Sequence, residues 1–380
     1  MMQTSRSFIF ALLALVALIA APPTAGAIDT AAREAILVDA ETGAVLMSKD
    51  PDAPMPPASM SKIMTMYLVF QHLDEGRLSL DDHLPVSERA WRMGGSKMFI
   101  EVGKEVKVED LIRGVIVQSG NDACVVFAEA LSGSEEGFAQ EMTETARELG
   151  MTDSHFANST GWPDPNQWMT ARDLATLAKR MIADYPQYYD YFAEMEFTYN
   201  EIRQGNRNPL LYRNIGVDGL KTGHTEEAGY GLTASAKQGE RRLILVVNGL
   251  SSAQERADES ARLLSWGFRE FENYELLSSG EQVDKAEVWL GKLDSVPLVA
   301  PRDFLVTLTR DARRDMTAKV IYEGPIPAPI AEGQEVARLE ISAPGMEPMV
   351  IPLVAGTEVE KLGPFGRLIA SLKHLILGQL

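Results

Sequence analysis

The chain has 380 residues, of which 45% are hydrophobic and 24% are charged, and its formal net charge is −18. This length suffices for two domains, one of them with a substantial core. The negative charge argues against nucleic acid as a partner, because a phosphate backbone requires a basic face. Cys124 is the only cysteine, so no intramolecular disulfide can form. The sequence contains no cluster of Cys and His residues, and we therefore expect neither a metal nor a cofactor.

Residues 1–27 have the pattern of a secretory signal peptide. Arg6 gives a basic start, residues 8–21 are almost wholly apolar, and Ala25-Gly26-Ala27 resembles a cleavage site. The apolar run is shorter than the ~20 residues that a spanning helix requires. We therefore expect the mature chain to be secreted across the cytoplasmic membrane, with an uncleaved anchor as the alternative.

Residues 28–275 alternate between strand-like and helical patterns, which predicts an α+β domain. Strands are expected over residues 35–40, 44–47, 217–225, 230–236 and 242–247. Helices are expected from Ser59 onward and over residues 108–131, 134–149, 170–181 and 260–271. The second of these helices is expected to be interrupted at Gly120. Residues 86–103 and 152–170 are expected to be irregular. Because strands come from both ends of the domain, we expect one antiparallel sheet with helices packed on it.

The pattern changes after residue 275. Short strand-like runs punctuated by Pro and Gly predict a small all-β domain over residues 276–362, in the form of a sandwich. We identify no catalytic constellation in this region.

The last segment, residues 363–380, predicts an amphipathic helix. Apolar residues recur at three- and four-residue spacing from Phe365 to Leu380, and Arg367 and Lys373 are among the few charges. The segment is too short to span a membrane. We expect it to lie on the inner-membrane surface beside anionic lipid, with docking on the β domain as the alternative.

Ser59-Met60-Ser61-Lys62 stands at the start of the first predicted helix. Ser59 and Lys62, three residues apart, share one helix face and lie side by side. A serine hydroxyl needs an adjacent base to act as a nucleophile, and a lysine can be that base where its pKa is lowered. The spacing alone is common, and a capped surface helix is the alternative interpretation.

Two further motifs in the same domain favour catalysis. They are Ser119-Gly120-Asn121, at the break between helices, and Lys221-Thr222-Gly223, on a strand. With Ser59-x-x-Lys62 they match, in order, the set that is typical of class A β-lactamases and penicillin-binding proteins, except that Asp is usual in place of Gly120.

The chemistry of such a set indicates a role for each residue. Ser59 attacks a carbonyl and forms an acyl-enzyme, and Lys62 takes its proton. Burial and the like charge of Lys221 are together expected to keep Lys62 neutral. Ser119 relays the proton to the leaving amine, and Asn121 holds Lys62 and the substrate amide.

The remaining residues are expected to bind the substrate. The backbone N–H groups of Ser59 and His224 would form an oxyanion hole. Gly223 would let the substrate lie against the strand edge. The charge of Lys221 and the hydroxyls of Thr222 and Thr225 would bind a substrate carboxylate.

The wider sequence resembles the low-molecular-mass penicillin-binding proteins, serine-type D-alanyl-D-alanine carboxypeptidases. The segments that carry this resemblance are residues 57–65, 118–123, 170–173, 202–204, 206–208, 218–225 and 264–268. The resemblance covers the whole mature chain. It implies a β-lactamase/transpeptidase-like fold for residues 28–275, and removal of the terminal D-alanine from peptidoglycan stem pentapeptides. It also implies acylation by β-lactam antibiotics, and membrane anchoring through residues 363–380.

Two positions depart from the family pattern. Some members carry an arginine just after the strand that ends near Val247, where it is thought to help bind the terminal carboxylate. Here the stretch is Asn248-Gly249-Leu250-Ser251, so that role is expected to fall to Lys221, Thr222 and Thr225. At positions 60 and 61, Met-Ser replaces the usual Leu-Thr or Met-Thr, which is a mild change.

Three other functions share this set of motifs. A class A β-lactamase needs a Glu in the loop before the Lys-Thr-Gly strand, whereas residues 156–169 contain only Asp164 as a carboxylate. A non-catalytic peptidoglycan-binding relative would have lost a catalytic residue, and none is lost. A DD-endopeptidase that acts on cross-links uses the same chemistry and is the nearest alternative.

Overall fold

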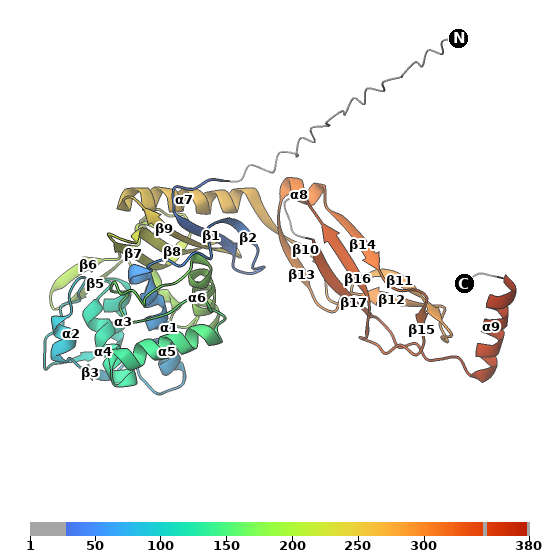
Figure 1. The fold of residues 1–380 in the computed structure, drawn as a ribbon, viewed down its shortest axis with the longest axis horizontal. Coiled ribbons are helices and arrows are strands. Elements are labelled where there is room, and N and C mark those ends of the chain that lie inside the picture. Colours follow the sequence, from blue (N-terminus) through green and yellow to red (C-terminus); the bar gives the residue numbers. More distant parts are fainter. Residues whose placement is uncertain (1–27, 345–347, 378–380) are drawn as a thin grey trace, which may run out of the picture.

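The computed structural model describes residues 28–344 and 348–377, with the backbone alone over residues 371–377. Figure 1 shows two parts side by side, and helix α7 (Ala253–Glu270) leads from the first into strand β10 (Phe271–Leu277) of the second. The predicted signal peptide, residues 1–27, lies outside the described residues.

A five-stranded sheet organises the first part, in the order β2-β1-β9-β8-β7. These strands are β1 (Glu34–Asp39), β2 (Val45–Lys49), β7 (Val217–Thr225), β8 (Gly229–Gln238) and β9 (Arg241–Leu250). Every pairing is antiparallel, and Ile36 of β1 lies opposite Val246 of β9. The two ends of the domain sequence therefore meet in one sheet, which confirms the prediction. Strand β7 lies at the edge of the sheet.

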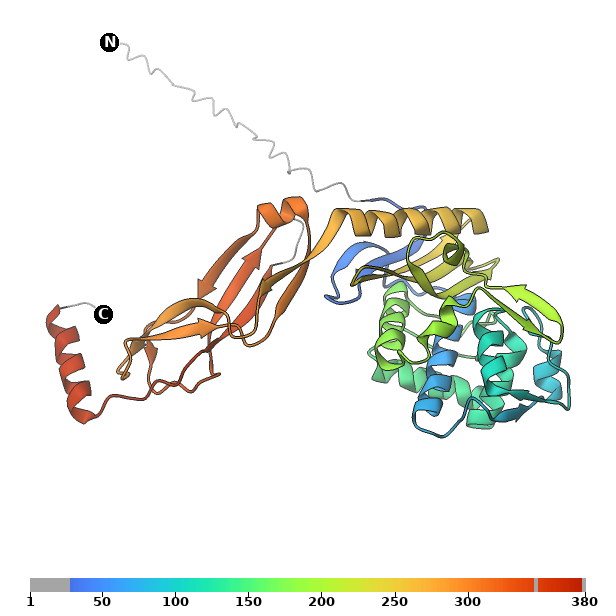
Figure 2. The same ribbon diagram turned by 180° about the vertical axis from the view of Figure 1, so that it is seen from behind.

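Both faces of this sheet are buried because alternate side chains enter two cores. Ile244 and Val246 of β9 face the helical block, whereas Leu243, Leu245 and Val247 pack with residues of α7. Figure 2 shows α7 lying over one face of the sheet and the helices on the other side. Because both faces of the strands are buried, their sequences are nearly continuous apolar runs.

The helical block surrounds α1 (Lys62–Asp74), which the short 3-10 helix η1 (Ala58–Ser61) precedes. The other helices of the block are α3 (Val108–Ile116), α4 (Asn121–Ser132), α5 (Glu135–Glu148) and α6 (Ala171–Asp184), and all four contact α1. Nearly every side chain of α1 is buried, as a central helix requires. The segments between these elements contain two 3-10 helices, η2 (Tyr189–Ala193) and η3 (Pro209–Tyr212). They also contain two short antiparallel hairpins: β3 (His83–Pro85) pairs with β4 (Glu105–Lys107), and β5 (Glu196–Tyr199) pairs with β6 (Ile202–Gly205).

Two helices begin where the sequence did not predict a helix start, and each begins at a serine that caps it. Helix α2 (Glu88–Arg92) lies within residues 86–103, which were predicted to be irregular, and Ser87 Oγ accepts the Ala90 N–H at 3.0 Å. Helix α7 begins seven residues earlier than predicted, where Ser252 Oγ accepts the Glu255 N–H at 3.0 Å. Its first two turns are mostly polar, so apolar spacing did not reveal them, although a serine cap favours a helix start.

The second part is all-β apart from one short helix, α8 (Arg310–Arg314). Strand β10 pairs with β13 (Phe304–Thr309), and six strands form a second sheet in the order β14-β16-β17-β12-β11-β15. These are β11 (Gln282–Trp289), β12 (Ser295–Val299), β14 (Thr317–Ile321), β15 (Ile326–Pro327), β16 (Glu335–Ser342) and β17 (Met349–Ala355). Leu277 of β10 and Phe304 of β13 share a hydrophobic core with residues of the six-stranded sheet, as in a sandwich. Because β10 starts at Phe271, we propose that this domain begins there, before residue 276.

Helix α9 (Pro364–Leu377) follows the β domain and lies at its far end (Figure 1). Phe365 is 81% exposed, and Leu368 and Ile369 are each 59% exposed. Among the described residues, no helix has the length and apolar character that would let it cross a membrane. The side chains of residues 371–380, which complete the predicted apolar face, lie outside the described residues.

Asp39, at the end of β1, connects the two parts of the molecule. Its buried carboxylate forms an ion pair with Arg241 at 2.9 Å and accepts the backbone N–H of Thr42 at 3.0 Å. It also accepts a hydrogen bond from the Asn273 side chain of β10 at 3.3 Å. One carboxylate thus holds the β1–β2 turn, β9 and the first strand of the β domain together.

Replacing Asp39 with Ala should lower the free energy of unfolding by about 3–5 kcal/mol, because it leaves the Arg241 charge buried without its partner. Urea denaturation followed by circular dichroism measures this change. Glu240→Ala is the matched control, since Glu240 is fully exposed and pairs with Lys237 at 3.5 Å on the β8–β9 turn. Equal stability of the two variants would contradict the structural role of Asp39.

Candidate active site

The hydroxyl of Ser59 and the amine of Lys62 are in contact. Ser59 belongs to η1, and Lys62 is the first residue of α1. Lys62 Nζ donates to Ser59 Oγ at 2.7 Å and to the backbone oxygen of Thr160 at 2.6 Å. The Lys62 side chain is fully buried. The spacing of three residues therefore produces the predicted contact between the two groups.

Burial changes the acid–base behaviour of Lys62. The pKa of its amine is lowered from 10.5 to about 8, mainly by burial, with a contribution from the charge of Arg207. Of the two expected causes, burial is therefore the main one, and the charge of Lys221 is not. A neutral amine at this position is thus accessible near physiological pH, and it already touches the hydroxyl from which it would take a proton.

Lys221 is a second buried amine, on the edge strand β7. It is 3% exposed, and its Nζ donates to the backbone oxygen of Thr222 at 3.3 Å. Burial, followed by the charges of Lys62 and Arg207, lowers the pKa of Lys221 well below its usual value. An anionic group of a ligand would reverse this effect, because an opposite charge favours the ammonium form.

Ser119 and Asn121 lie at the predicted break between α3 and α4. Ser119 has a φ of +60°, and its buried Oγ has no hydrogen-bond partner within the described residues. A Cβ at Gly120 would lie 2.9 Å from Asp122 Oδ1 and 3.2 Å from the Gly114 oxygen, so the usual Asp has no room here. The break therefore presents an unpaired hydroxyl.

Asn121 differs from its expected role. Its Nδ2 donates to the backbone oxygen of Gly94 at 2.8 Å, and the Thr160 oxygen takes the position on Lys62 that was expected for Asn121. The neighbouring Asp122 was not predicted as part of the site. Its carboxylate accepts the N–H groups of Met98 and Phe99, each at 3.0 Å, and so holds these two residues at the start of α4.

Gly223 permits close packing between β7 and η1. A Cβ at this position would lie 2.8 Å from the Pro57 oxygen, 3.1 Å from Met60 Cγ and 3.3 Å from Ala58 Cβ. We expected the glycine to make room for substrate, but the structure shows that it makes room for the segment that carries Ser59. The His224 side chain is exposed and packs on the Tyr230 ring, with centroids 3.9 Å apart.

The two threonines of this strand have different environments. Thr222 is buried, at 5% exposure. Thr225 Oγ1 accepts the Ala228 N–H at 3.0 Å and thereby closes the turn between β7 and β8. Its hydroxyl hydrogen is still available for donation to a ligand.

Arg256 of α7 is a cation that the sequence interpretation missed. It is 8% exposed, its guanidinium lies 5.7 Å from the centre of the Tyr230 ring, and its charge contributes to the lowered pKa of Lys221. Its buried Nε has no hydrogen-bond partner within the described residues. An arginine is therefore present beside β7 although residues 248–251 contain none. Only the packing of α7 on β8 brings it there.

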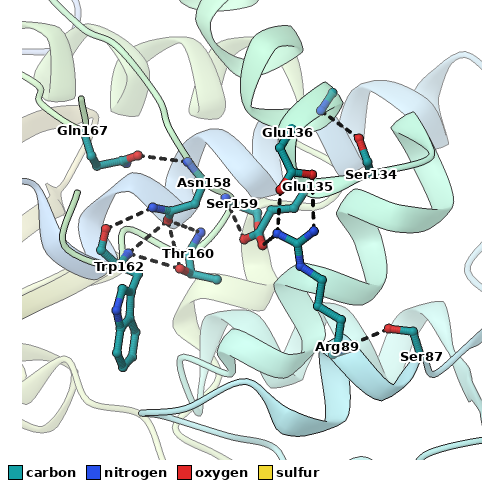
Figure 3. A network of polar contacts seen from close by, with 12 residues as sticks. Ser87, Arg89, Ser134, Glu135, Glu136, Asn158, Ser159, Thr160, Trp162 and Gln167 are labelled. Atoms are coloured by element: carbon teal, nitrogen blue, oxygen red, sulfur yellow. Dashed lines mark hydrogen bonds and ion pairs between the residues drawn. The ribbon is translucent and has the colours of Figure 1, made fainter. Parts of the chain in front are cut away.

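The irregular segment 158–162 is held by hydrogen bonds of its own side chains and of Glu135 (Figure 3). Asn158 Oδ1 accepts the N–H groups of Thr160, Gly161 and Trp162 at 3.1, 2.8 and 3.0 Å. Ser159 Oγ donates to Glu135 Oε1 of α5 at 2.9 Å. These bonds fix the Thr160 backbone oxygen that contacts Lys62.

Comparison with known proteins agrees with this geometry. The D-alanyl-D-alanine carboxypeptidase family model matches residues 19–252, and the model of the penicillin-binding protein 5 C-terminal domain matches residues 271–361. The D-alanyl-D-alanine carboxypeptidase DacC of Escherichia coli is 41% identical over 356 residues, which cover 92% of this chain and 89% of that protein.

A solved structure shows a similar fold. The crystal structure of penicillin binding protein 5 from Haemophilus influenzae has a TM-score of 0.78 at 36% identity, and the match covers 88% of this chain and 99% of that one. A D-alanyl-D-alanine endopeptidase of Escherichia coli is 29% identical over 263 residues, which cover 66% of this chain and 82% of that protein. The chain belongs to the D-alanyl-D-alanine carboxypeptidase family of serine peptidases.

Proposed function

We propose that this chain is a serine-type carboxypeptidase that removes the terminal D-alanine from peptidoglycan stem pentapeptides through an acyl-Ser59 intermediate. The observation that carries the proposal is the 2.7 Å hydrogen bond between Ser59 and the buried Lys62, in a chain of this family. This pair supplies the nucleophile and the base that acyl transfer requires.

In the acylation step, Ser59 Oγ attacks the carbonyl of the penultimate D-alanine while neutral Lys62 takes the hydroxyl proton. The backbone N–H groups of Ser59 and His224 stabilise the oxyanion. Ser119 relays the proton from Lys62 to the nitrogen of the terminal D-alanine, the C–N bond breaks, D-alanine leaves, and Lys62 is neutral again. Water then attacks the ester and gives a proton to Lys62, which passes it to Ser59 Oγ as the shortened peptide leaves, so that Ser59 is restored.

The terminal carboxylate of the substrate would lie beside Lys221 and Arg256, with the hydroxyls of Thr222 and Thr225 as further donors. Within the described residues, neither of these buried basic groups has a carboxylate partner, and this favours an anion at this place, because a ligand carboxylate would offset the cost of burying their charges. Asn121 would donate to the substrate amide, after exchanging its bond to the Gly94 oxygen.

The alternatives are less well supported. The carboxypeptidase relative matches more of the chain, at higher identity, than the endopeptidase. In the loop where a β-lactamase would carry its Glu, Asp164 Oδ1 instead caps a turn by accepting the Asn166 N–H at 2.7 Å. Penicillins are therefore expected to acylate Ser59 and to inhibit the enzyme.

We also propose that the mature chain works in the periplasm, attached peripherally to the cytoplasmic membrane through residues 363–380. The exposure of Phe365, Leu368 and Ile369 on α9 supports this placement, because apolar side chains on a helix favour a lipid interface.

The mature chain should release D-alanine from a pentapeptide that ends in D-alanyl-D-alanine, as measured with a D-amino-acid oxidase assay. Ser59→Ala should lower the rate by about a thousandfold or more, because the nucleophile is lost. Ser79→Ala, at an exposed serine, is the control. Faster cleavage of a cross-linked dimer than of the pentapeptide would favour the endopeptidase instead.

Acylation by benzylpenicillin should depend on pH through Lys62. Because only the neutral amine accepts the proton, the second-order rate constant should rise about tenfold per pH unit below the pKa of about 8, and level off above it. Stopped-flow measurements between about pH 6 and pH 9.5 test this. The variant His224→Gln is the control, and the pH profile of its acylation rate constant should have the same midpoint as the wild type. A flat profile, or a midpoint near the ordinary lysine value, would contradict the role of Lys62.

Arg256→Gln should lower kcat/KM for the pentapeptide by about 10- to 100-fold, through loss of a charge-assisted hydrogen bond to the terminal carboxylate. The same peptide with an amidated C-terminus is the control substrate. Wild type and variant should hydrolyse the amidated peptide equally slowly. An equal loss on both peptides would show that Arg256 has only a structural role.

A chain that ends at Leu362 should lose binding to vesicles that contain anionic lipid, as measured by flotation. Leu368→Ser combined with Ile369→Ser should weaken binding of the full chain, because both side chains are exposed on α9. If the shortened chain floats with vesicles as completely as the full chain, the helix is not the anchor.

A further inference from the structure

The buried carboxylate of Glu135 joins two segments of the chain that lie apart in sequence. Glu135 is the first residue of α5 and is 6% exposed. Its Oε1 accepts the Ser159 hydroxyl at 2.9 Å and the Ser159 N–H at 3.4 Å. Its Oε2 accepts Arg89 of α2 at 2.8 Å. Figure 3 shows the carboxylate between these two partners, so that each oxygen holds a different segment.

Ser159 directly precedes the carbonyl that contacts Lys62. A peptide unit is planar, and its C=O and N–H groups point in opposite directions. The unit after Ser159 and Thr160 has its N–H, that of Gly161, bonded to Asn158 Oδ1 at 2.8 Å. Its C=O, that of Thr160, accepts Lys62 Nζ at 2.6 Å. Asn158 therefore sets the direction of the carbonyl, and the bonds of Ser159 to α5 set its position.

The segment that follows α2, the helix of Arg89, meets the same loop a second time. A Cβ at Gly95 would lie 2.9 Å from the Trp162 ring, so the two segments are in direct contact there. Glu135 joins them at one place, and the contact between Gly95 and Trp162 joins them at another. The two joints form a closed frame, and the Thr160 carbonyl belongs to it.

The chemistry of the three donors favours a carboxylate at residue 135. An ionised carboxylate only accepts hydrogen bonds, and it has enough lone pairs for a hydroxyl, a backbone N–H and a guanidinium. The neighbouring Glu136 offers a comparison. Its side chain is 71% exposed, and within the described residues its side-chain hydrogen bonds go to Arg89 alone. Of these two adjacent carboxylates, only Glu135 reaches the loop that holds Lys62.

We propose that Glu135 is a positioning residue for the catalytic base. Through Ser159 it fixes the place of the Thr160 carbonyl, and this carbonyl holds Lys62 Nζ beside the Ser59 hydroxyl. Glu135 contacts neither the nucleophile nor the substrate, and it takes no proton in the reaction. The inference rests on the proposed function, in which Lys62 is the base. A small displacement of a positioned catalytic group lowers the rate strongly.

Ser159→Ala tests the proposal without changing any charge, because it removes only the hydroxyl that donates to Glu135. Thr65 Oγ1 still donates to the Ser159 oxygen at 2.6 Å, so the loop keeps its attachment to α1. The limiting rate constant of acylation by benzylpenicillin should fall about tenfold, since Lys62 is held less well. The dissociation constant of the noncovalent complex should stay unchanged. Stopped-flow measurements over a range of penicillin concentrations separate the two constants.

The pH profile distinguishes positioning from a loss of stability. The Thr160 carbonyl accepts a hydrogen bond from Lys62 and so favours the charged amine. When this bond loosens, the pKa of Lys62 should fall, and the midpoint should move about half a pH unit below the wild-type value of about 8. A variant that is only less stable would keep the wild-type midpoint. The ionisable groups whose charges interact with Lys62 are unchanged in this variant: Asp122 and Cys124 of α4, Arg207, and Lys221 of β7.

Two substitutions at adjacent residues form a matched pair. Glu135→Gln places an amide N–H₂ against one of the three donors, so it should lower both the rate constant and the midpoint. Combined with Ser159→Ala, it should lower the rate constant no further than the more affected single variant, because both changes break the same link. Glu136→Gln removes the same charge at a residue that binds only Arg89, and it should behave as the wild type.

Each rate constant is referred to the fraction of protein that benzylpenicillin acylates, so that unfolded molecules do not contribute. A wild-type rate constant and midpoint in Ser159→Ala would overturn the positioning role. Equal losses in Glu135→Gln and Glu136→Gln would overturn it as well. A wild type that neither reacts with penicillin at Ser59 nor releases D-alanine would overturn the proposed function, and this inference with it.

Discussion

Lys62 Nζ is enclosed between the Ser59 hydroxyl and the Thr160 carbonyl, and burial lowers its pKa to about 8. The surrounding structure serves this enclosure. α1 is buried at the centre of the helical block, so the amine at its first residue has no access to bulk water. The loop from Asn158 to Trp162 holds the carbonyl, and the edge strand β7 contacts η1 and α1. A surface lysine at the same spacing would stay charged and could not act as a base.

Three glycines allow the segments around Ser59 to approach one another. At Gly161, Gly223 and Gly120, a Cβ would come within 3 Å of the Ala58 oxygen, the Pro57 oxygen and Asp122 Oδ1, respectively. The first two bring the loop and the strand against η1, and the third forms the break that presents Ser119. Close packing of this kind gives a rigid site, since catalytic groups work best when their geometry is fixed before the substrate binds.

Much of this organisation could be predicted from the sequence, because it depends on local spacing. The Ser59–Lys62 contact, the break at Gly120 and the single antiparallel sheet follow from helical and strand periods. Arg256 could not be predicted, since only the packing of α7 brings it beside β7 from a helix that follows the sheet. The bond of Asn121 to the Gly94 oxygen and the close approach of the Pro57 oxygen to Gly223 could not be predicted for the same reason. In both cases the partner is a backbone oxygen, and the sequence does not show which one comes near.

The central claim is that Ser59 is the residue acylated in this site. Incubation of the mature chain with benzylpenicillin, followed by proteolysis and mass spectrometry, tests it most directly. The account predicts one covalent adduct, on Ser59, which is absent in Ser59→Ala and strongly slowed in Lys62→Arg, because an arginine stays charged at every accessible pH. An adduct on another residue, or none on the folded protein, would contradict the account.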